Sequence, residues 1–227
     1  MHYLSYLSTD GGYSKSQITG QLKKNDGGAS SRRLNTIVFD NIKDLKEFFH
    51  VYPNTNLPNF LSKNTNLLYS ELVSLGNTLL GWLDDLIPHN IKSEFSESLF
   101  SMSKGSDRNL LRVLHYPPVK GKVEQGAIRA AAHEDINLIT LLVSGSQPGL
   151  EAMDMNGVWH KVPVDKGMIT VNVGDMLQMA SNKYFPSTSH RVVNPENSKQ
   201  NVSRFSLPMF MHPRNEVVLK SGITAYD

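Results

Sequence analysis

Two side chains that bind divalent metals stand two residues apart near the middle of the chain. His133 and Asp135 open the segment HEDINLITLLV, which continues as an apolar, partly β-branched run of the kind found in buried strands. Because residues i and i+2 of a strand face the same side, we expect His133 and Asp135 to share one face, with Glu134 on the other. An unpaired carboxylate in a core is costly, and a metal ion would supply the missing countercharge. The spacing therefore favours a metal site.

A third ligand of the right type follows downstream, because His190 lies in another short strand-like segment, STSHRVV. Two histidines and one carboxylate form the facial triad that holds iron in non-haem Fe(II) oxygenases. Such a triad leaves three positions of an octahedral iron open, where a chelating cosubstrate and dioxygen can bind. The same residues are also compatible with a hydrogen-bonded His/Asp pair at a strand end, so the pattern alone leaves both interpretations open.

The segment VSRFSLPMF carries a candidate site for a small organic acid. Arg204 and Ser206 share one strand face in an otherwise apolar run. A guanidinium pairs bidentately with a carboxylate, and a hydroxyl can donate a further hydrogen bond. Upstream, Tyr116 ends LLRVLHY, where Arg112, Leu114 and Tyr116 should face one side. The alternative is a solvated arginine on an edge strand, which Pro208 would permit.

Helices are expected ahead of these segments. The apolar spacing of IKDLKEFFHVYP predicts a first helix with Phe48 and Phe49 on one face and Pro53 at its end. Leucines at steps of three and four predict a stronger helix that ends before Pro88, followed by a shorter helix with Ile91 and Leu99 on its face. The leucines of the stronger helix are Leu68, Leu72, Leu75, Leu79, Leu83 and Leu86.

After Asp107 the pattern changes to roughly eight short strands separated by turn signals. This order predicts a mainly β fold with flanking α-helices and a jelly-roll core, also called a double-stranded β-helix. We expect residues 1–35 to be a polar, partly mobile segment and 36–227 to be one domain. Its helical front part would extend to about 106 and its jelly-roll core from about 107 to 213. Asn172 and Asp175, in VNVGD, are expected to shape a turn.

Composition excludes several classes of protein. The chain has 227 residues, with 23 Lys and Arg against 21 Asp and Glu, which gives a formal net charge of +2. This balance provides no electrostatic basis for binding nucleic acid or anionic lipid. The absence of cysteine excludes disulfides and thiolate chemistry. The N-terminus has no apolar signal core and no run is long enough to cross a bilayer, so we expect a cytoplasmic protein.

Six blocks in order resemble a known family: LRVLHYPP, RAAAHEDINLITLL, GLEAMDMNGVW, VNVGDMLQMASN, STSHRVVNP and RFSLPMFMHPR. The chain is similar to the Fe(II)/2-oxoglutarate-dependent dioxygenases of the isopenicillin N synthase-like group, from about DLKEFFHVY to FMHPR. The resemblance implies a jelly-roll core, Fe(II) held by His133, Asp135 and His190, and 2-oxoglutarate held by Arg204 and Ser206 with help from Tyr116. Leu114 stands where plant-type members usually have asparagine.

The resemblance implies an oxidoreductase that oxidises, most often by hydroxylation, a small-molecule substrate with O2 while 2-oxoglutarate becomes succinate and CO2. No catalytic residue is implied beyond the metal centre. Strand alternation makes Arg112, Arg129 and Phe210 candidate substrate contacts. Isopenicillin N synthase and aminocyclopropane carboxylate oxidase share the pattern without using 2-oxoglutarate, and there the arginine meets the substrate's own carboxylate. Because the chain ahead of DLKEFF is shorter than in most members, a non-catalytic ligand-binding relative is a third possibility. The substrate and the oligomeric state are not predicted.

Overall fold

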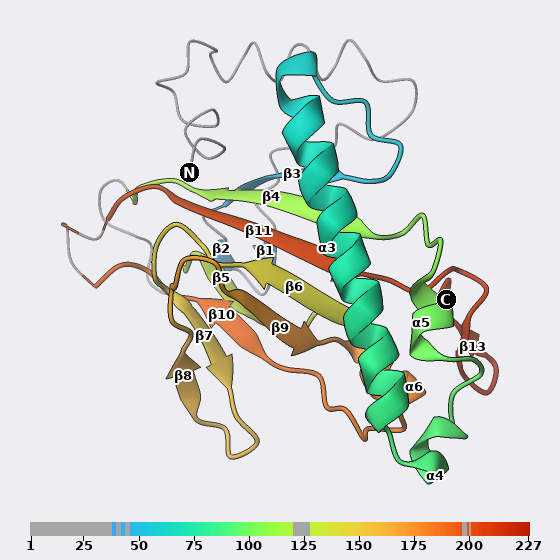
Figure 1. Ribbon diagram of the computed structural model, residues 1–227. Helices are drawn as coiled ribbons and strands as arrows, with labels where there is room; N and C mark the ends of the chain where they lie inside the picture. The colour runs from blue at the N-terminus through green and yellow to red at the C-terminus, as the bar shows by residue number, and fades with distance from the viewer. Residues whose placement is uncertain (1–37, 40–41, 44–45, 120–127, 197–198, 200) are drawn as a thin grey trace.

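The computed structural model describes residues 38–39, 42–43, 46–119, 128–196, 199 and 201–227. The polar segment expected over residues 1–35 lies outside these described residues. Within them, two antiparallel sheets form the jelly-roll core that the strand pattern predicts (Figure 1).

The larger sheet has five strands, and every neighbouring pair in it is antiparallel. In spatial order these are β3 (Glu47–Val51), β4 (Leu110–Tyr116), β11 (Arg204–Met211), β6 (Ile139–Val143) and β9 (Ile169–Val173). The smaller sheet contains β5 (Ala130–His133), β10 (His190–Val192), β7 (Leu150–Met153) and β8 (Trp159–Lys161). Two short hairpins complete the described strands: β1 (Val38–Phe39) with β2 (Ile42–Lys43), and β12 (Val218–Lys220) with β13 (Ile223–Thr224).

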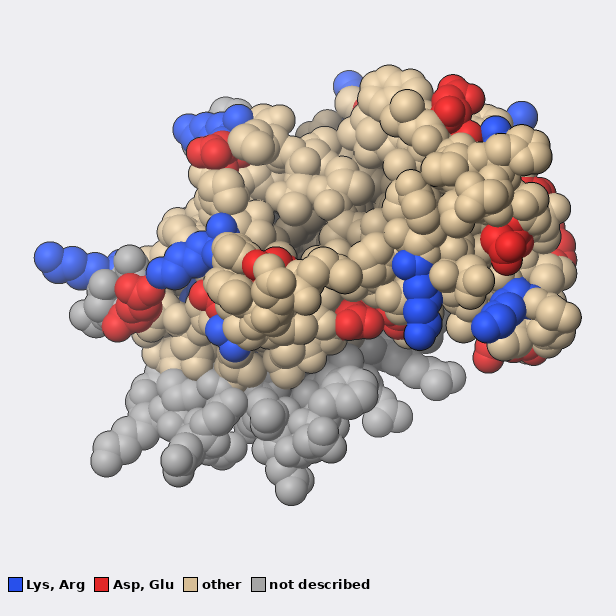
Figure 2. Space-filling view, turned by 90° about the horizontal axis from the view of Figure 1, so that it is seen from below, with Lys and Arg blue, Asp and Glu red and all other residues tan. Residues whose placement is uncertain are grey.

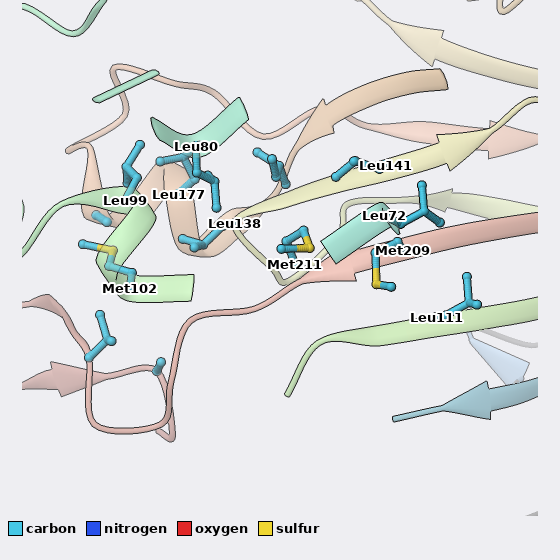
Figure 3. Close-up of a cluster of buried hydrophobic side chains, with 14 of the residues drawn as sticks. Leu72, Leu80, Leu99, Met102, Leu111, Leu138, Leu141, Leu177, Met209 and Met211 are labelled. Atoms are coloured by element: carbon cyan, nitrogen blue, oxygen red, sulfur yellow. The ribbon is translucent and has the colours of Figure 1, made fainter. Parts of the chain in front are cut away.

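The long helix α3 (Asn59–Leu86) crosses the outer face of the five-stranded sheet (Figure 1). Leu72 of the predicted leucine stripe is buried against the sheet, together with Leu80, which lies outside the predicted set, whereas Leu86 of that set is exposed. The side chains that the two buried leucines meet include Met209 and Met211 of β11 and Leu141 of β6, all fully buried (Figure 3). This core supports one face of the larger sheet, so the other face is available to build a site.

Strand alternation places the candidate residues on that inner face. On β11, Arg204 and Ser206 alternate with Phe205 and Leu207. Arg204 is the cross-strand partner of Tyr116 on β4. A second buried cluster joins the two sheets beside them and consists of Leu114, Tyr116, Ala130 and Val192.

The prediction of a helix over IKDLKEFFHVYP is wrong. Residues Glu47–Val51 form β3, the outermost strand of the larger sheet, paired with β4. A short apolar run fits both periods, and here the free edge of β4 offers backbone partners that an isolated turn of helix would lack. The front part of the domain therefore contributes a strand to the core as well as helices.

Three short helices differ from the expected elements. In place of one helix before residue 100, the chain forms α4 (His89–Lys92) and α5 (Leu99–Ser103). A third, α6 (Asp175–Ala180), follows Gly174, where only a break was expected. A Cβ on Gly174 would lie 2.3 Å from the carbonyl oxygen of Asn137 and 2.7 Å from that of Asp135. Glycine therefore allows α6 to begin directly against the loop that carries Asp135.

Charged side chains of both signs are interspersed on the face shown in Figure 2, and neither sign gathers into a continuous patch there. Among the helices that the structure describes, none combines the length and the apolar character needed to span a lipid bilayer.

Candidate metal centre

The two candidate histidines lie directly opposite each other on neighbouring strands. His133 ends β5, His190 begins β10, and the two are cross-strand partners with ring centroids 4.3 Å apart. In each ring Nδ1 lies near a backbone carbonyl two residues earlier, Ala131 at 2.7 Å and Thr188 at 3.0 Å. A carbonyl only accepts, so Nδ1 carries the proton and donates it. In the neutral form of each ring, Nε2 then carries the lone pair that can bind a metal ion.

Asp135 completes the cluster, although β5 ends at His133 and the carboxylate projects from the loop that follows. Its Oδ1 lies 3.7 Å from Nε2 of His190. One ligand atom from each of His133, Asp135 and His190 lies within 4.8 Å of the others. Two neutral imidazole nitrogens and one carboxylate oxygen at this spacing form the donor set of a facial-triad iron site.

The other oxygen of Asp135 is held by two donors. Its Oδ2 accepts from Thr140 Oγ1 at 2.6 Å and from Asn172 Nδ2 at 2.9 Å. Asn137 Nδ2 donates to the same Thr140 hydroxyl at 2.8 Å, which leaves the hydroxyl proton for the carboxylate. Thr140 and Asn172 are cross-strand partners on β6 and β9. The sheet therefore fixes Asp135 so that Oδ1 alone faces the histidines.

These two donors were not predicted from the sequence, which assigned Asn172 to a turn. Asn172 instead lies within β9, and its side chain donates a hydrogen bond to Asp135. The available signal was a polar side chain inside each of two largely apolar strands, ITLLV and ITVNV. Such a residue needs a buried partner, but only the register of β6 against β9 identifies Asp135 as that partner.

Electrostatics keep His133 in the form that a metal requires. Desolvation of its ring lowers the pKa of His133, and the neighbouring His190 lowers it further. The imidazole is thus held neutral near neutral pH, with Nε2 available for coordination.

A Thr140→Val variant should bind Fe(II) about 10- to 100-fold more weakly, because Asp135 loses one of the two donors that orient it. The change also leaves buried polar groups without partners and should lower the free energy of unfolding by about 1–3 kcal/mol. Anaerobic Fe(II) titration and thermal unfolding measure the two effects. Thr78→Val, on the exposed face of α3, is the matched control. Unchanged Fe(II) affinity in Thr140→Val would show that the hydroxyl does not position the carboxylate.

One cavity contains both the three candidate metal ligands and the candidate site for an organic acid. Its lining comes from both sheets and includes most of the residues singled out from the sequence. The predicted residues in it are Arg112, Tyr116, His133, Asp135, His190, Arg204, Ser206 and Phe210. Arg129 is not among the lining residues. It is buried and donates from Nη2 to the backbone oxygen of Val202, so a substrate contact by Arg129 stays a prediction.

Arg204 is a buried cation that still has a hydrogen-bond donor available for a ligand. Only 2% of its surface is exposed, and its guanidinium carbon lies 5.1 Å from the centroid of the Tyr116 ring. Nε donates to the carbonyl oxygen of Gln147 at 3.0 Å, while Nη1 is buried and has no hydrogen-bond partner among the described residues. Burial lowers the pKa of Arg204, yet a guanidinium stays charged at any ordinary pH. A ligand carboxylate would satisfy both the charge and the unpaired donor.

A second arginine lies in the same cavity on β4. Arg112 donates from Nε to Nε2 of His50, its cross-strand partner on β3, at 2.9 Å. Its guanidinium carbon lies 5.1 Å from the ring centroid of Phe48 and 4.9 Å from that of Phe210. His50 stacks on Phe48 with centroids 4.8 Å apart. Arg112 is therefore held in one orientation by a hydrogen bond and two aromatic faces.

His50, which accepts a hydrogen bond from Arg112, should have a pKa well below that of an ordinary histidine. Burial, and secondarily the charge of Arg112, lower the pKa of His50 from 6.5 to about 4. The folded protein then binds fewer protons than the unfolded chain between pH 6.5 and 4, so stability should decrease as the pH falls through this window. Titration of the imidazole signals by NMR checks the value. A His50 midpoint above about pH 6 would contradict the neutral, hydrogen-bond-accepting role.

Similarity to known proteins identifies the superfamily of the chain. The model of the 2OG-Fe(II) oxygenase superfamily matches residues 108–213. The crystal structure of a Shewanella oneidensis protein named as an oxygenase is 50% identical, with a TM-score of 0.75, and the match covers 81% of this chain and 68% of that one. The chain belongs to the 2OG-Fe(II) oxygenase superfamily. The narrower isopenicillin N synthase-like assignment stays a prediction.

Two further proteins are less similar to this chain. A proline hydroxylase of Petromyces alliaceus is 30% identical, and the match covers 79% of this chain and 60% of the hydroxylase. A Neurospora crassa protein, solved at full length in complex with alpha-KG, is 27% identical with a TM-score of 0.60, over 77% of this chain and 57% of that one. The chain spans between 30% and 60% of the length of the curated relatives it matches.

Proposed function

We propose that this superfamily member is a non-haem Fe(II)- and 2-oxoglutarate-dependent oxygenase that hydroxylates a small organic molecule. In this reaction 2-oxoglutarate would be converted to succinate and CO2. The observation that carries the proposal is one cavity that contains both the His133, Asp135 and His190 cluster and Arg204, whose Nη1 has no hydrogen-bond partner among the described residues. We assign the activity to residues 36–227 as a single domain.

The residues divide into two binding groups. His133, Asp135 and His190 would hold Fe(II) through two imidazole nitrogens and one carboxylate oxygen. Arg204 would pair with the far carboxylate of 2-oxoglutarate, with Ser206 and Tyr116 beside it on the same cavity wall. When bound, iron supplies the activation of O2, and 2-oxoglutarate supplies two of the electrons required.

The rest of the cavity wall favours this chemistry by excluding water. Leu142, Leu150 and Val162 line the cavity between the polar groups. Apolar walls lower the local dielectric, which strengthens the pairing of Arg204 with a carboxylate. The chain's own contribution is therefore to hold the two ligands in a fixed relation and to keep solvent away from them.

The alternative functions keep the same binding residues. A 2-oxoglutarate-independent Fe(II) oxidase would use Arg204 for the substrate's own carboxylate, and a non-catalytic relative would bind ligand without turnover. The cytoplasmic location and the lack of nucleic-acid or membrane partners remain predictions from composition. The oligomeric state stays open.

The direct test is formation of succinate from 2-oxoglutarate by the Fe(II)-loaded protein in air, with and without chelator. The proposal expects slow succinate formation even without added substrate, and its loss with chelator. Binding of 2-oxoglutarate without any succinate would favour the non-catalytic alternative. Iron binding without 2-oxoglutarate binding would favour the cosubstrate-independent oxidase.

A further inference from the structure

Arg112 is a charged residue in the cavity that the proposed iron and 2-oxoglutarate sites do not use. It lies on the same face of β4 as Tyr116 and four residues away, which corresponds to about 13 Å along a strand. Because Arg204 is the cross-strand partner of Tyr116, Arg112 and Arg204 occupy opposite ends of the cavity wall. A ligand at Arg112 would therefore be distinct from a carboxylate at Arg204.

The guanidinium of Arg112 is prepared to receive a planar acceptor. His50 accepts from Nε, and the rings of Phe48 and Phe210 restrict the guanidinium through its π face. Among the hydrogen bonds of the described residues, Arg112 donates through Nε alone, which leaves the two Nη groups as the remaining donors. Because the guanidinium of Arg112 is already fixed in one orientation, it loses little conformational entropy when a carboxylate binds to it.

The charge of the cavity favours an acidic substrate. Among its described lining residues, the two guanidinium groups of Arg112 and Arg204 carry two positive charges against the single carboxylate of Asp135. The two positive charges of Fe(II) would be cancelled by the two carboxylates of 2-oxoglutarate. The cavity therefore keeps an excess of positive charge after both have bound, and a neutral substrate would leave it uncompensated.

Resting on the proposed function, we propose that Arg112 anchors the substrate, and that this substrate is a small carboxylic acid with an apolar body. The carboxylate would pair with the Nη groups of Arg112. The apolar body would extend from there into the cavity beside the ring of Phe210. Phe210 contributes by holding the guanidinium and by adding to the apolar lining.

The test compares acids with their amides, because the two share a shape and differ in charge. Phenylacetate and phenylacetamide, and hexanoate and hexanamide, are titrated into the anaerobic protein loaded with Fe(II) and 2-oxoglutarate, and binding is measured by calorimetry. We expect each acid to bind about tenfold or more tightly than its amide. Arg112→Met should remove this preference and leave amide binding unchanged, whereas Arg112→Lys should retain part of it.

Arg108→Met, an exposed arginine just before β4, is the matched control and should keep the preference for acids. Equal binding of acids and amides by the unmodified protein, or an undiminished preference in Arg112→Met, would overturn the proposal. Weaker 2-oxoglutarate binding in Arg112→Met would assign Arg112 to the cosubstrate and also overturn it. Failure of the unmodified protein to bind 2-oxoglutarate would count against the proposed function, while calorimetry on the metal-free protein still tests Arg112.

Discussion

A His133→Ala variant is expected to lose iron-dependent turnover by at least about a hundredfold. The change removes one of three candidate metal ligands. Changes to groups that only orient a ligand already lower metal affinity or activity by about 10- to 100-fold. The ring of His133 is partly desolvated where it lines the cavity, but the residue as a whole is exposed at the end of β5. The fold should therefore tolerate its loss, with a change in the free energy of unfolding below about 1 kcal/mol. Loss of activity should therefore reflect loss of the metal and not of the fold.

Iron content after anaerobic loading, succinate formation and thermal unfolding are measured together for this variant. His160→Ala is the matched control, because His160 is an exposed histidine that contacts Asp154 in the hairpin of β7 and β8. The control should keep both iron and turnover. Full iron content and full activity in His133→Ala would show that the ligand assignment is wrong.

An Arg204→Met variant should bind 2-oxoglutarate about a hundredfold more weakly while it still binds iron. Methionine keeps much of the apolar stem but removes the buried charge and the unpaired Nη1 donor. Loss of one partner from a buried charge pair costs about 2–5 kcal/mol, and each 1.4 kcal/mol is about tenfold in affinity. Titration of the Fe(II)-loaded variant with 2-oxoglutarate measures the effect.

The folded state of Arg204→Met should be no less stable without ligand, because burial of a guanidinium with an unsatisfied donor is itself unfavourable. Arg108→Met serves as control for the loss of an arginine elsewhere. Unchanged 2-oxoglutarate affinity in Arg204→Met would place the cosubstrate elsewhere in the cavity, and weaker iron binding would indicate that Arg204 acts on the metal cluster.

The pair of His133 and Asp135 was predictable as a candidate metal site because its signal is local. His133 and Asp135 are two residues apart at a strand end, and the structure brings His190 opposite His133 through the β5–β10 pairing. Arg204 and Ser206 were predictable in the same way, from alternation within β11. The two predictions of residues on a shared face needed only the period of a strand, which is a property of consecutive residues, whereas His190 was singled out by its residue type.

The residues that support the site were not predictable, because their roles depend on pairing between distant strands. Thr140 and Asn172 meet Asp135 only through the register of β6 against β9. His50 contacts Arg112 only because β3 pairs with β4 as a strand. The apolar spacing of EFFHV is compatible with a helix as well, so the sequence did not indicate this contact. The support of Arg112 by His50 therefore became visible only in the fold.

The measurement that tests the central claim most directly is an anaerobic titration of the Fe(II)-loaded protein with 2-oxoglutarate, followed by visible absorption. Chelation of iron by the keto acid should produce a charge-transfer band that saturates at about one equivalent. The band should be absent in His133→Ala and should require much more 2-oxoglutarate in Arg204→Met. Stable binding of iron to the unmodified protein without such a band would contradict the assignment of this cavity to 2-oxoglutarate.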